Sequence, residues 1–322
     1  MKGIARKFIF LISVVALALP CIASAADINP LQLGLPPLSD RGRRPVESEH
    51  RPAPVRIYSL NDANLSKDAE AYVLHPDGSI ERVAIKKKGG GMSVSFRTPF
   101  GDGPMHGVHN LYVIDRKVID GILVVRVAKW MTIHHHCSWG HDYKYDRERL
   151  RPRFLDTVPL EIVGYGLWDG NFHSYTRSGD RIPFRVFSYG RPAQKVRVRL
   201  CTARGWCKEK ITDSDGRVTF QLIRDYYPDS WSHFRSQHRD RFYVTAEYEI
   251  KDKGTYSGET YNAIKMISTL SWWYSPSRKD YTSYLAGFSV GMITLTLTGV
   301  SIFIYRERRK RLLKEVVFNE KD

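Results

Sequence analysis

The uncharged run at residues 284–305, YLAGFSVGMITLTLTGVSIFIY, constrains this chain more than any other feature. A helix needs about 20 predominantly apolar residues to cross the hydrocarbon core of a bilayer, and this run is long enough. Its Ser and Thr hydroxyls can bond back to the helix backbone, so they are tolerated in lipid. We therefore predict a single C-terminal transmembrane helix that contacts membrane lipid; the alternative is a buried core helix.

A basic segment follows this run directly. Residues 306–322 begin RERRKRLLKE, and clusters of Lys and Arg beside a membrane span favour the cytoplasmic side. We predict that residues 306–322 form a short cytoplasmic tail and that residues 269–283, which contain WWY, form an aromatic juxtamembrane segment. The alternative for the two tryptophans is an edge of the domain that precedes the membrane.

The N-terminus has the pattern of a secretory signal peptide. Lys2, Arg6 and Lys7 precede the apolar stretch 8–20, and Ala23-Ser24-Ala25 supplies small residues for cleavage. We predict a signal peptide at residues 1–25; a lipoprotein anchor at Cys21 is the alternative. Together the two ends predict a single-pass protein of the bacterial inner membrane with its main part in the periplasm. A eukaryotic type I protein remains the alternative.

The chain is strongly basic, with a formal net charge of +16. A basic surface raises the question of nucleic acid, but the export signal argues against that partner. Anionic lipid, an acidic partner protein or a solvated surface fits better, and we predict no nucleic-acid binding.

The exported part has strand-like patterning throughout. Residues 26–55 are rich in Pro and charge and predict a disordered lead-in. Short alternating or β-branched runs then recur, with turn signals such as Pro-Asp-Gly between them and no helix-period segment. We predict a mainly β protein with two antiparallel β-sandwich domains of the Ig or transthyretin-like type, at residues 56–137 and 159–268, joined by a linker at residues 138–158.

The cysteines suggest one disulfide. Cys201 and Cys207 stand on two strand-like flanks around Gly205, and the oxidising periplasm permits a bond between them. Cys137 is then unpaired, and an odd cysteine in an exported chain is an intermolecular partner, a free thiol or a ligand.

The second domain resembles a known family. The segments PLEIVG, RIPFRVFSYGRPAQKVRVRL and TDSDGRVTFQL within residues 159–250 are similar to the exported β-sandwich family associated with nickel and cobalt uptake systems, itself similar to transthyretin-like modules. The resemblance implies a fold, a compartment, metal handling and a transporter partner. The sequence departs from the family pattern in having no histidine near residue 26 and no multi-span permease region.

One segment, TIHHHCSWGHD at residues 132–142, is dense in side chains that bind transition metals. Imidazole and thiolate suit Ni, Co, Cu and Zn. In an extended strand side chains alternate, so His134 and His136 would share one face. A second group, MHGVHN, lies upstream. Our predicted metal ligands are His134, His136, Cys137, His141, His106, His109 and Asp142, the last as a direct ligand or as a partner that orients an imidazole.

The sequence is compatible with three functions. We predict a membrane-anchored accessory protein that binds Ni, Co, Cu or Zn for metal uptake or resistance and has no catalytic residues. The alternative is an envelope scaffold or adaptor that binds partner proteins. A metal-dependent enzyme is a weaker third hypothesis, because only Glu148 and Glu161 offer a general base.

Overall fold

The structure is a computed structural model of the 322-residue chain. It describes residues 28–34, 55–88, 91–97, 107–134, 147–167, 176–223, 240–275, 277 and 279–310. The predicted signal peptide, most of the predicted lead-in, part of the linker and most of the basic tail lie outside these residues.

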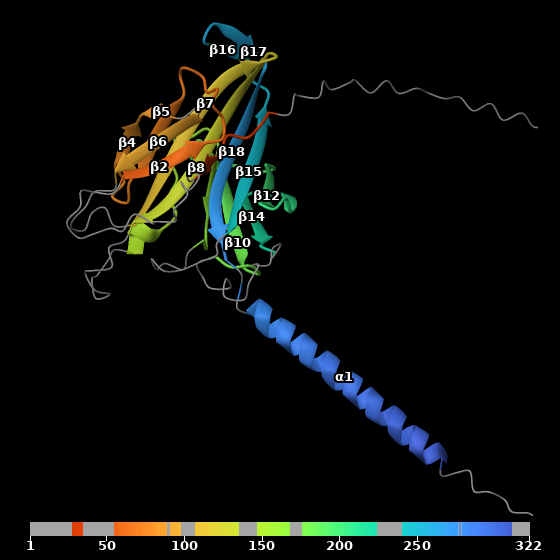
Figure 1. The fold of residues 1–322 in the computed structure, drawn as a ribbon. Coiled ribbons are helices and arrows are strands. Elements are labelled where there is room, and N and C mark those ends of the chain that lie inside the picture. The colour runs from red at the N-terminus through yellow and green to blue at the C-terminus, as the bar shows by residue number, and fades with distance from the viewer. Residues whose placement is uncertain are drawn as a thin grey trace, which may run out of the picture.

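A single large sheet of eight strands dominates the fold (Figure 1). Adjacent strands are antiparallel with one exception, because β18 pairs with β8 in parallel. In spatial order the strands are β13 (Cys207–Ile211), β12 (Arg197–Thr202), β15 (Asp240–Ile250), β18 (Ala263–Tyr274), β8 (Ile122–His134), β7 (Gly107–Ile119), β3 (Glu70–Leu74) and β4 (Ile80–Val83).

Two smaller sheets pack on the large one. The first has the order β1 (Leu33–Gly34), β2 (Val55–Leu60), β6 (Gly91–Arg97) and β5 (Ile85–Lys88). The second joins β11 (Arg191–Pro192), β10 (Arg181–Ser188) and β14 (Arg217–Gln221), with β9 (Glu161–Gly164) also paired to β10. A separate hairpin, β16 (Gly254–Tyr256) and β17 (Glu259–Tyr261), and a 3-10 helix, η2 (Arg147–Leu150), complete the described β part.

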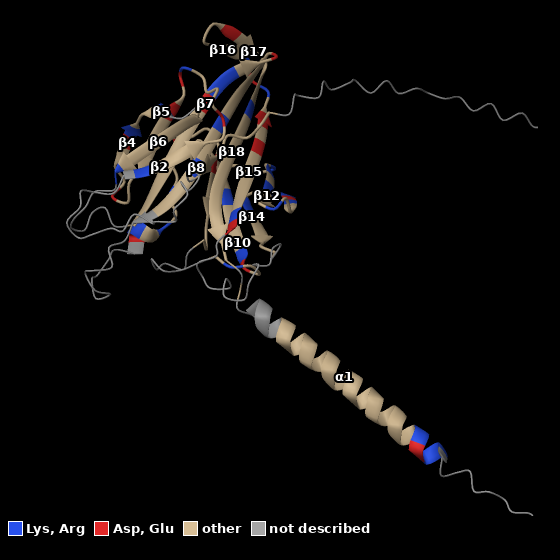
Figure 2. Ribbon diagram, in the orientation of Figure 1, with Lys and Arg blue, Asp and Glu red and all other residues tan. Residues whose placement is uncertain are grey.

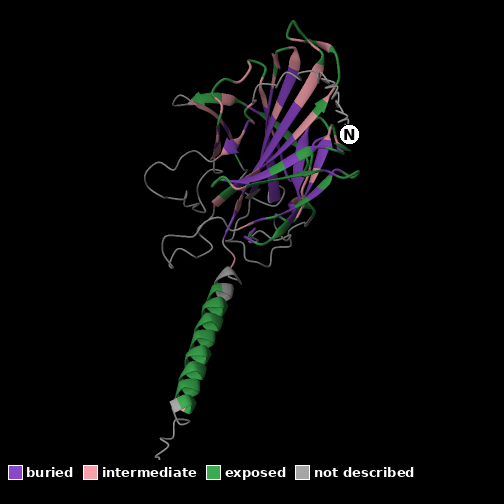
Figure 3. Cartoon of the chain, turned by 90° about the vertical axis from the view of Figure 1, so that its right-hand side faces the viewer, coloured by how far each residue is buried: buried purple, intermediate pink, exposed green. Residues whose placement is uncertain are grey.

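The three sheets enclose two hydrophobic cores, one on each face of the large sheet. Because successive side chains of a strand point to opposite faces, β7 sends Val108, Tyr112 and Ile114 into one core and Leu111 and Val113 into the other. The strands β7 and β8 are therefore buried on both faces over much of their length, as Figure 3 shows in purple. Burial on both faces explains the nearly continuous apolar run GILVVRVAKWM, which begins at Gly121 and continues through most of β8.

The arrangement differs from the expected pair of separate antiparallel sandwiches. Segments from both predicted domains share the eight-stranded sheet, and the parallel contact between β18 and β8 joins them. Periodicity identifies strands but does not reveal which strands pair over long sequence distances. The domain boundaries themselves stay predictions.

The last strand extends beyond the predicted end of the second sandwich at residue 268, to Tyr274. Trp272 is buried in the larger core, and its Nε1–H donates to Thr176 Oγ1 at 3.2 Å. Trp273 packs against both cores. Both tryptophans thus belong to a strand of the large sheet, which is the alternative raised for them, and the predicted juxtamembrane segment 269–283 begins inside that strand.

The C-terminal helix α1 (Lys279–Lys310) leaves the β part and packs on nothing in the described chain (Figures 1 and 3). Its segment Tyr284–Arg309 is long and apolar enough to cross a membrane. Ser289, Thr294, Thr296 and Thr298 each donate to the carbonyl four residues earlier, as expected of hydroxyls in such a helix. The predicted membrane-length helix is confirmed at the level of fold, and Figure 2 shows basic residues at its far end.

Candidate binding cleft and buried polar clusters

Most of the predicted metal ligands fall outside the described chain. His106, His136, Cys137, His141 and Asp142 lie in its gaps, and the structure describes only the backbone of His134. Within the residues that are described, no group of three or more His, Cys, Asp or Glu side chains is arranged to hold a metal ion. The metal site therefore stays a prediction.

The register of the hairpin β7–β8 bears on whether the two histidine clusters meet. Gly107 pairs with His134 at one end of the hairpin. His106 precedes the first of these residues and His135 follows the second. The two predicted clusters are thus joined to the sheet at neighbouring backbone positions.

His109 is the one predicted ligand whose side chain is described, and it is buried at the end of the smaller core. Its Nδ1 lies 2.9 Å from Nδ1 of His75, and Nε2 of His75 lies 3.1 Å from a carboxylate oxygen of Glu81. One imidazole nitrogen must donate and the other accept across the shorter contact, so the two rings cannot both be doubly protonated. A metal at His109 would have to displace this bond or use the other ring nitrogen. Sequence analysis did not identify His75 as a partner of His109, because no pattern near His75 in the sequence indicates a contact with β7.

The larger core contains a buried charged pair. Lys129 Nζ donates to Glu161 Oε1 at 2.5 Å and to the carbonyl of Arg153 at 3.1 Å. Tyr112 donates its hydroxyl to the same carboxylate oxygen at 2.8 Å, and the N–H of Leu155 donates to Oε2 at 2.9 Å. Burial lowers the pKa of Lys129, and the charge of Glu161 opposes that shift. Burial, with a further contribution from Glu161, raises the pKa of Tyr112 well above its usual value.

These contacts bear on the hypothesis of a metal-dependent enzyme. Glu161 is fully buried, and both of its carboxylate oxygens accept bonds from the protein, so its position is that of a structural anion. Glu148 is exposed and pairs with Arg151 at 2.8 Å. Glu161 therefore lacks the accessible position that a general base needs, and the hypothesis of an enzyme stays untested.

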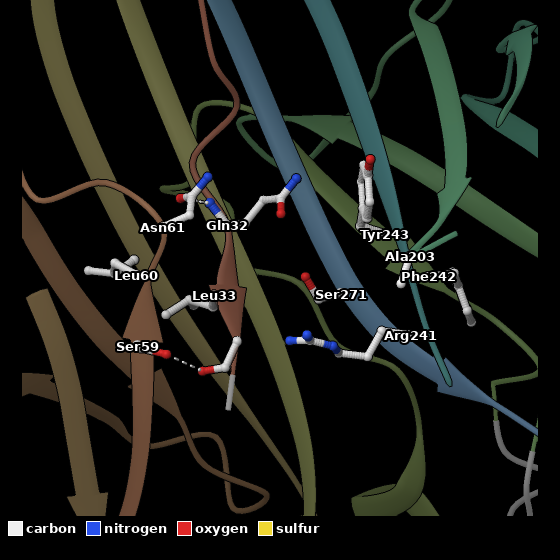
Figure 4. A pocket seen from close by; sticks show the side chains of 11 residues that line it. Gln32, Leu33, Ser59, Leu60, Asn61, Ala203, Arg241, Phe242, Tyr243 and Ser271 are labelled. Atoms are coloured by element: carbon white, nitrogen blue, oxygen red, sulfur yellow. Dashed lines mark hydrogen bonds between the residues drawn. The ribbon is translucent and has the colours of Figure 1, made fainter. Parts of the chain in front are cut away.

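A polar region lies where the first small sheet meets the face of β12, β15 and β18 that the second small sheet does not cover. Two adjoining hollows of about 310 and 510 Å³ share the residues Gln32, Asn61 and Tyr243. We call them together the polar cleft (Figure 4 shows the smaller hollow). Several polar or charged side chains line the polar cleft: Gln32, Asn61, Arg241, Tyr243, Thr245, Glu247 and Ser271.

One wall of the polar cleft is the segment 29–34, which hydrogen bonds hold in place. The N–H of Gln32 donates to Asn61 Oδ1 at 2.7 Å, and Asn61 Nδ2 donates to the carbonyl of Pro30 at 2.9 Å. Thr269 in β18 donates its hydroxyl to the carbonyl of Leu31. The Asn61 side chain is therefore already hydrogen-bonded to the segment 29–34, whereas the side-chain amide of Gln32 faces the cleft (Figure 4).

The other wall is one face of β15. Strand alternation sends Phe242, Val244 and Ala246 into the larger core and leaves Arg241, Tyr243, Thr245 and Glu247 on the opposite face. In β18 Ser271 stands opposite Tyr243. Gly34 in β1 leaves room for the arginine, because a Cβ there would lie 3.2 Å from Nη1 of Arg241. The alternation in residues 240–250 was the sequence signal for this open face.

An ion cluster closes one end of the polar cleft. Arg126 donates to Asp62 Oδ2 and Asp115 Oδ2, each at 2.6 Å. Burial alone would raise the pKa of Asp62, but the N–H of Asn64 and the guanidinium of Arg126 outweigh it and lower that pKa. Arg126 is thus neutralised within the protein, whereas Arg241 forms no ion pair with any described residue.

The predicted disulfide is confirmed and lies in the wall of the larger hollow. Cys201 and Cys207 are bonded with a Cα–Cα distance of 4.1 Å. They are paired residues of β12 and β13, joined by a tight turn in which Gly205 has a φ of 95°. Glycine adopts this left-handed conformation without the steric cost that a side chain brings.

Comparison with known proteins adds no family. No family model matches the sequence, and no curated protein matches it. A DUF4785 family protein from Legionella pneumophila subsp. pneumophila str. Philadelphia 1 is 9% identical with a TM-score of 0.20, over 60% of this chain and 46% of that one. A tetra-tandem repeat in the extending region of a large adhesion protein is 9% identical with a TM-score of 0.20, over 76% and 49%.

A third solved structure, the BSP domain of a biofilm associated protein, is 10% identical with a TM-score of 0.17, over 69% of this chain and 28% of that one. The chain thus spans less than half the length of each of the three structures. TM-scores this low carry no conclusion about the function or the detailed fold of this chain.

Proposed function

We propose that the chain is a non-enzymatic, extracytoplasmic binding protein, anchored in the bacterial inner membrane by α1, that holds an envelope component in the polar cleft. The observation that carries this proposal is a set of polar side chains in the cleft that have no partner in the described chain. Ser271 and Thr245 line the two hollows and are each 6% exposed, and neither hydroxyl forms a hydrogen bond with another described residue. Hydroxyls at the wall of a cleft that have no such bond are available to a polar ligand.

The ends of the chain support the anchored topology. The segment Tyr284–Arg309 is apolar enough to span a bilayer, and its basic end, with Arg306, Arg308 and Arg309, favours the cytoplasmic side. The disulfide between Cys201 and Cys207 fits an oxidising compartment. With the helix as the anchor, the polar cleft would face the periplasm.

Site-specific photocrosslinking in intact cells tests the binding proposal. A photoreactive residue at Gln32 should form an adduct with an envelope component on illumination. The matched control is the same residue at Thr219, which is exposed on β14 in the other small sheet. Equal adducts from both positions, or none from either, would contradict a specific site in the cleft.

Metal binding is a second candidate function, and one observation favours it. The pairing of Gly107 with His134 attaches the two predicted histidine clusters to the same end of one hairpin. We propose that His134, His136, Cys137 and His141 bind Ni, Co, Cu or Zn, with neutral imidazoles and a thiolate as donors. Because a protonated imidazole cannot bind metal, affinity should weaken below about pH 6.

Isothermal titration of the full-length protein in detergent with each of the four metals tests this second function. We expect binding in the wild type and a loss of binding in the His134→Ala/His136→Ala variant. The control is His173→Ala, which removes a histidine that belongs to neither predicted cluster. Wild-type affinity no tighter than tens of micromolar for all four metals would remove this candidate.

A further inference from the structure

The polar cleft has a chemical character that narrows its ligand, and we infer that it binds an oligosaccharide bearing a carboxylate. This inference rests on the proposed binding function and names its ligand class. The cleft runs along β15 from Arg241 to Glu247, which are six residues apart and thus about 20 Å apart in an extended strand. A groove of this length accommodates a chain of several sugar rings.

The polar groups of the cleft match sugar hydroxyls. The Gln32 amide and the hydroxyls of Ser271 and Thr245 are donors and acceptors without partners in the described chain. Ser271 and Thr245 are each 6% exposed, so water reaches them only through the cleft. A ligand with many hydroxyls satisfies such groups, whereas an apolar ligand would leave them without hydrogen bonds.

The apolar residues that border the cleft argue against a peptide with apolar side chains. Leu33, Leu60 and Phe242 are 2%, 7% and 0% exposed, so their side chains belong to the cores and offer no open apolar surface. Peptide recognition normally combines main-chain bonds with pockets for side chains. The smaller hollow also exposes apolar atoms beside its amide, hydroxyl and guanidinium groups, but Leu33, Leu60 and Phe242 are too deeply buried to form a pocket for an apolar side chain.

One aromatic ring is placed as a platform. Tyr243 lies in both hollows, on the open face of β15. Its neighbours across the sheet are Ser271 on one side and Cys201 on the other, and both are small. The side chain of Tyr243 is half-buried and lines both hollows, so that a sugar ring in the cleft can pack its apolar face against the tyrosine.

The two ends of the cleft differ in charge. Arg241 is the charged residue among those that line the smaller hollow, and its guanidinium has no ion pair in the described chain. In the larger hollow the two arginines are already paired, Arg126 with Asp62 and Arg199 with Glu209, and Glu247 adds a further negative charge that repels an anion. A carboxylate on the ligand would therefore bind at Arg241, where two parallel N–H···O bonds are available, and neutral rings would extend toward Glu247.

An array of carboxylated oligosaccharides of about four rings, each with its carboxyl-reduced counterpart, tests the inference against full-length protein in detergent. We expect binding of at least one acidic member and at least a tenfold weaker signal for its reduced form, since a charge-assisted bond contributes about 1.5–3 kcal/mol. Arg241→Ala should weaken binding at least tenfold, and the acidic and reduced forms should then bind equally. Tyr243→Ala should weaken binding, whereas Tyr243→Phe should retain it.

The matched control is Arg181→Ala. Arg181 is an exposed arginine of β10, on the other small sheet, and it forms no bond through its side chain in the described chain. Its removal takes the same charge from the protein and should leave binding unchanged. Equal weakening by Arg241→Ala and Arg181→Ala would mean general attraction of an anion to a basic protein and would overturn the inference.

Two outcomes separate this inference from the binding function on which it rests. If no acidic oligosaccharide binds, but the photoreactive residue at Gln32 gives a protease-sensitive adduct, the ligand is a protein and only the carbohydrate inference fails. If neither experiment gives a signal, both proposals fail. A Gln32 adduct that resists protease and is destroyed by periodate, together with binding on the array, supports both.

Discussion

Strands β8 and β12 belong to the same eight-stranded sheet, yet they meet different surroundings. From Leu123 to Thr132, β8 is buried at every residue except Arg126, because packed side chains cover both of its faces. In β12, Val198 and Leu200 are buried while Arg197 and Arg199 are exposed. Among the residues that the structure describes, the sheet is therefore covered on both faces at its centre and on one face near one edge.

This contrast indicates that the centre of the sheet stabilises the fold, whereas its exposed face is available for binding. At the closed centre even a charge must be paired inside the protein, as Lys129 is with Glu161. On the open face charges and hydroxyls can remain without protein partners, as in the polar cleft. Substitutions should therefore have large effects on stability at the centre and small effects on the open face, where they should affect binding instead.

The largest effect is expected at the centre. Glu161→Gln would leave the ammonium of Lys129 buried without a countercharge, at a cost of about 3–5 kcal/mol in the free energy of unfolding. Urea unfolding followed by tryptophan fluorescence measures the loss. The double variant Lys129→Met/Glu161→Leu is the control, and it should recover part of the stability, because an apolar pair needs no countercharge. The recovery should be incomplete, because the Tyr112 hydroxyl and the N–H of Leu155 lose their acceptor. A single variant as stable as the wild type would show that the pair is not a structural requirement.

The two faces of β12 allow a direct comparison within one strand. Leu200→Ala on the covered face should cost about 2–5 kcal/mol, through lost burial and a cavity. Arg199→Ala on the open face should change the free energy of unfolding by no more than about 0.5 kcal/mol, since its ion pair with Glu209 is exposed. The same unfolding experiment gives both values. Similar losses from the two variants would mean that the open face is covered by something.

The disulfide at the edge of the sheet should have an intermediate effect. It closes a short loop of sequence separation 6, for which the loop-entropy relation gives about 2 kcal/mol. Cys201→Ser/Cys207→Ser should lower the free energy of unfolding by that amount, and a reducing agent should lower it equally in the wild type. If reduction has no effect on the wild type, the bond contributes nothing to stability.

The smallest effect is expected from Asp62 at the end of the cleft, and it should depend on pH. Its folded-state pKa is lowered below the usual 3.8, so its stabilising contribution is present above the unfolded-state pKa and is lost as the pH falls through the folded one. Asp62→Asn should therefore be less stable than the wild type at pH 7, with a gap that narrows toward pH 3. Chemical unfolding at several pH values measures this gap. A gap that widens in acid would contradict the sign of the shift.

The local features that sequence analysis predicted correctly share one property. The membrane-length helix, the β character and the bond between Cys201 and Cys207 depend on residues close together in the chain. Length without charge, alternation and a tight turn are each visible within a few residues. The continuous apolar run in β8 was also visible, but its meaning, burial on both faces, requires knowledge of what packs there.

The remaining features arise from contacts between distant segments. Lys129 meets Glu161 across 32 residues and His75 meets His109 across 34, and no local pattern marks them as partners. The polar cleft joins Gln32 to Tyr243 and Arg241, so sequence analysis placed no site there. A cleft of this kind exists only after strands from both ends of the chain have paired.

By itself the sequence determined the apolar helix, the recurring strands and the turn that brings Cys201 to Cys207, whereas the export signal expected at the N-terminus stays a prediction. Those features follow from hydrophobicity and backbone preference over short stretches. Only the tertiary structure decided that β18 would lie parallel to β8, that Lys129 would need Glu161, and that one face of β15 would stay open. The physical reason is that pairing and burial depend on which distant surfaces cover each face, and this information is spread over the whole chain.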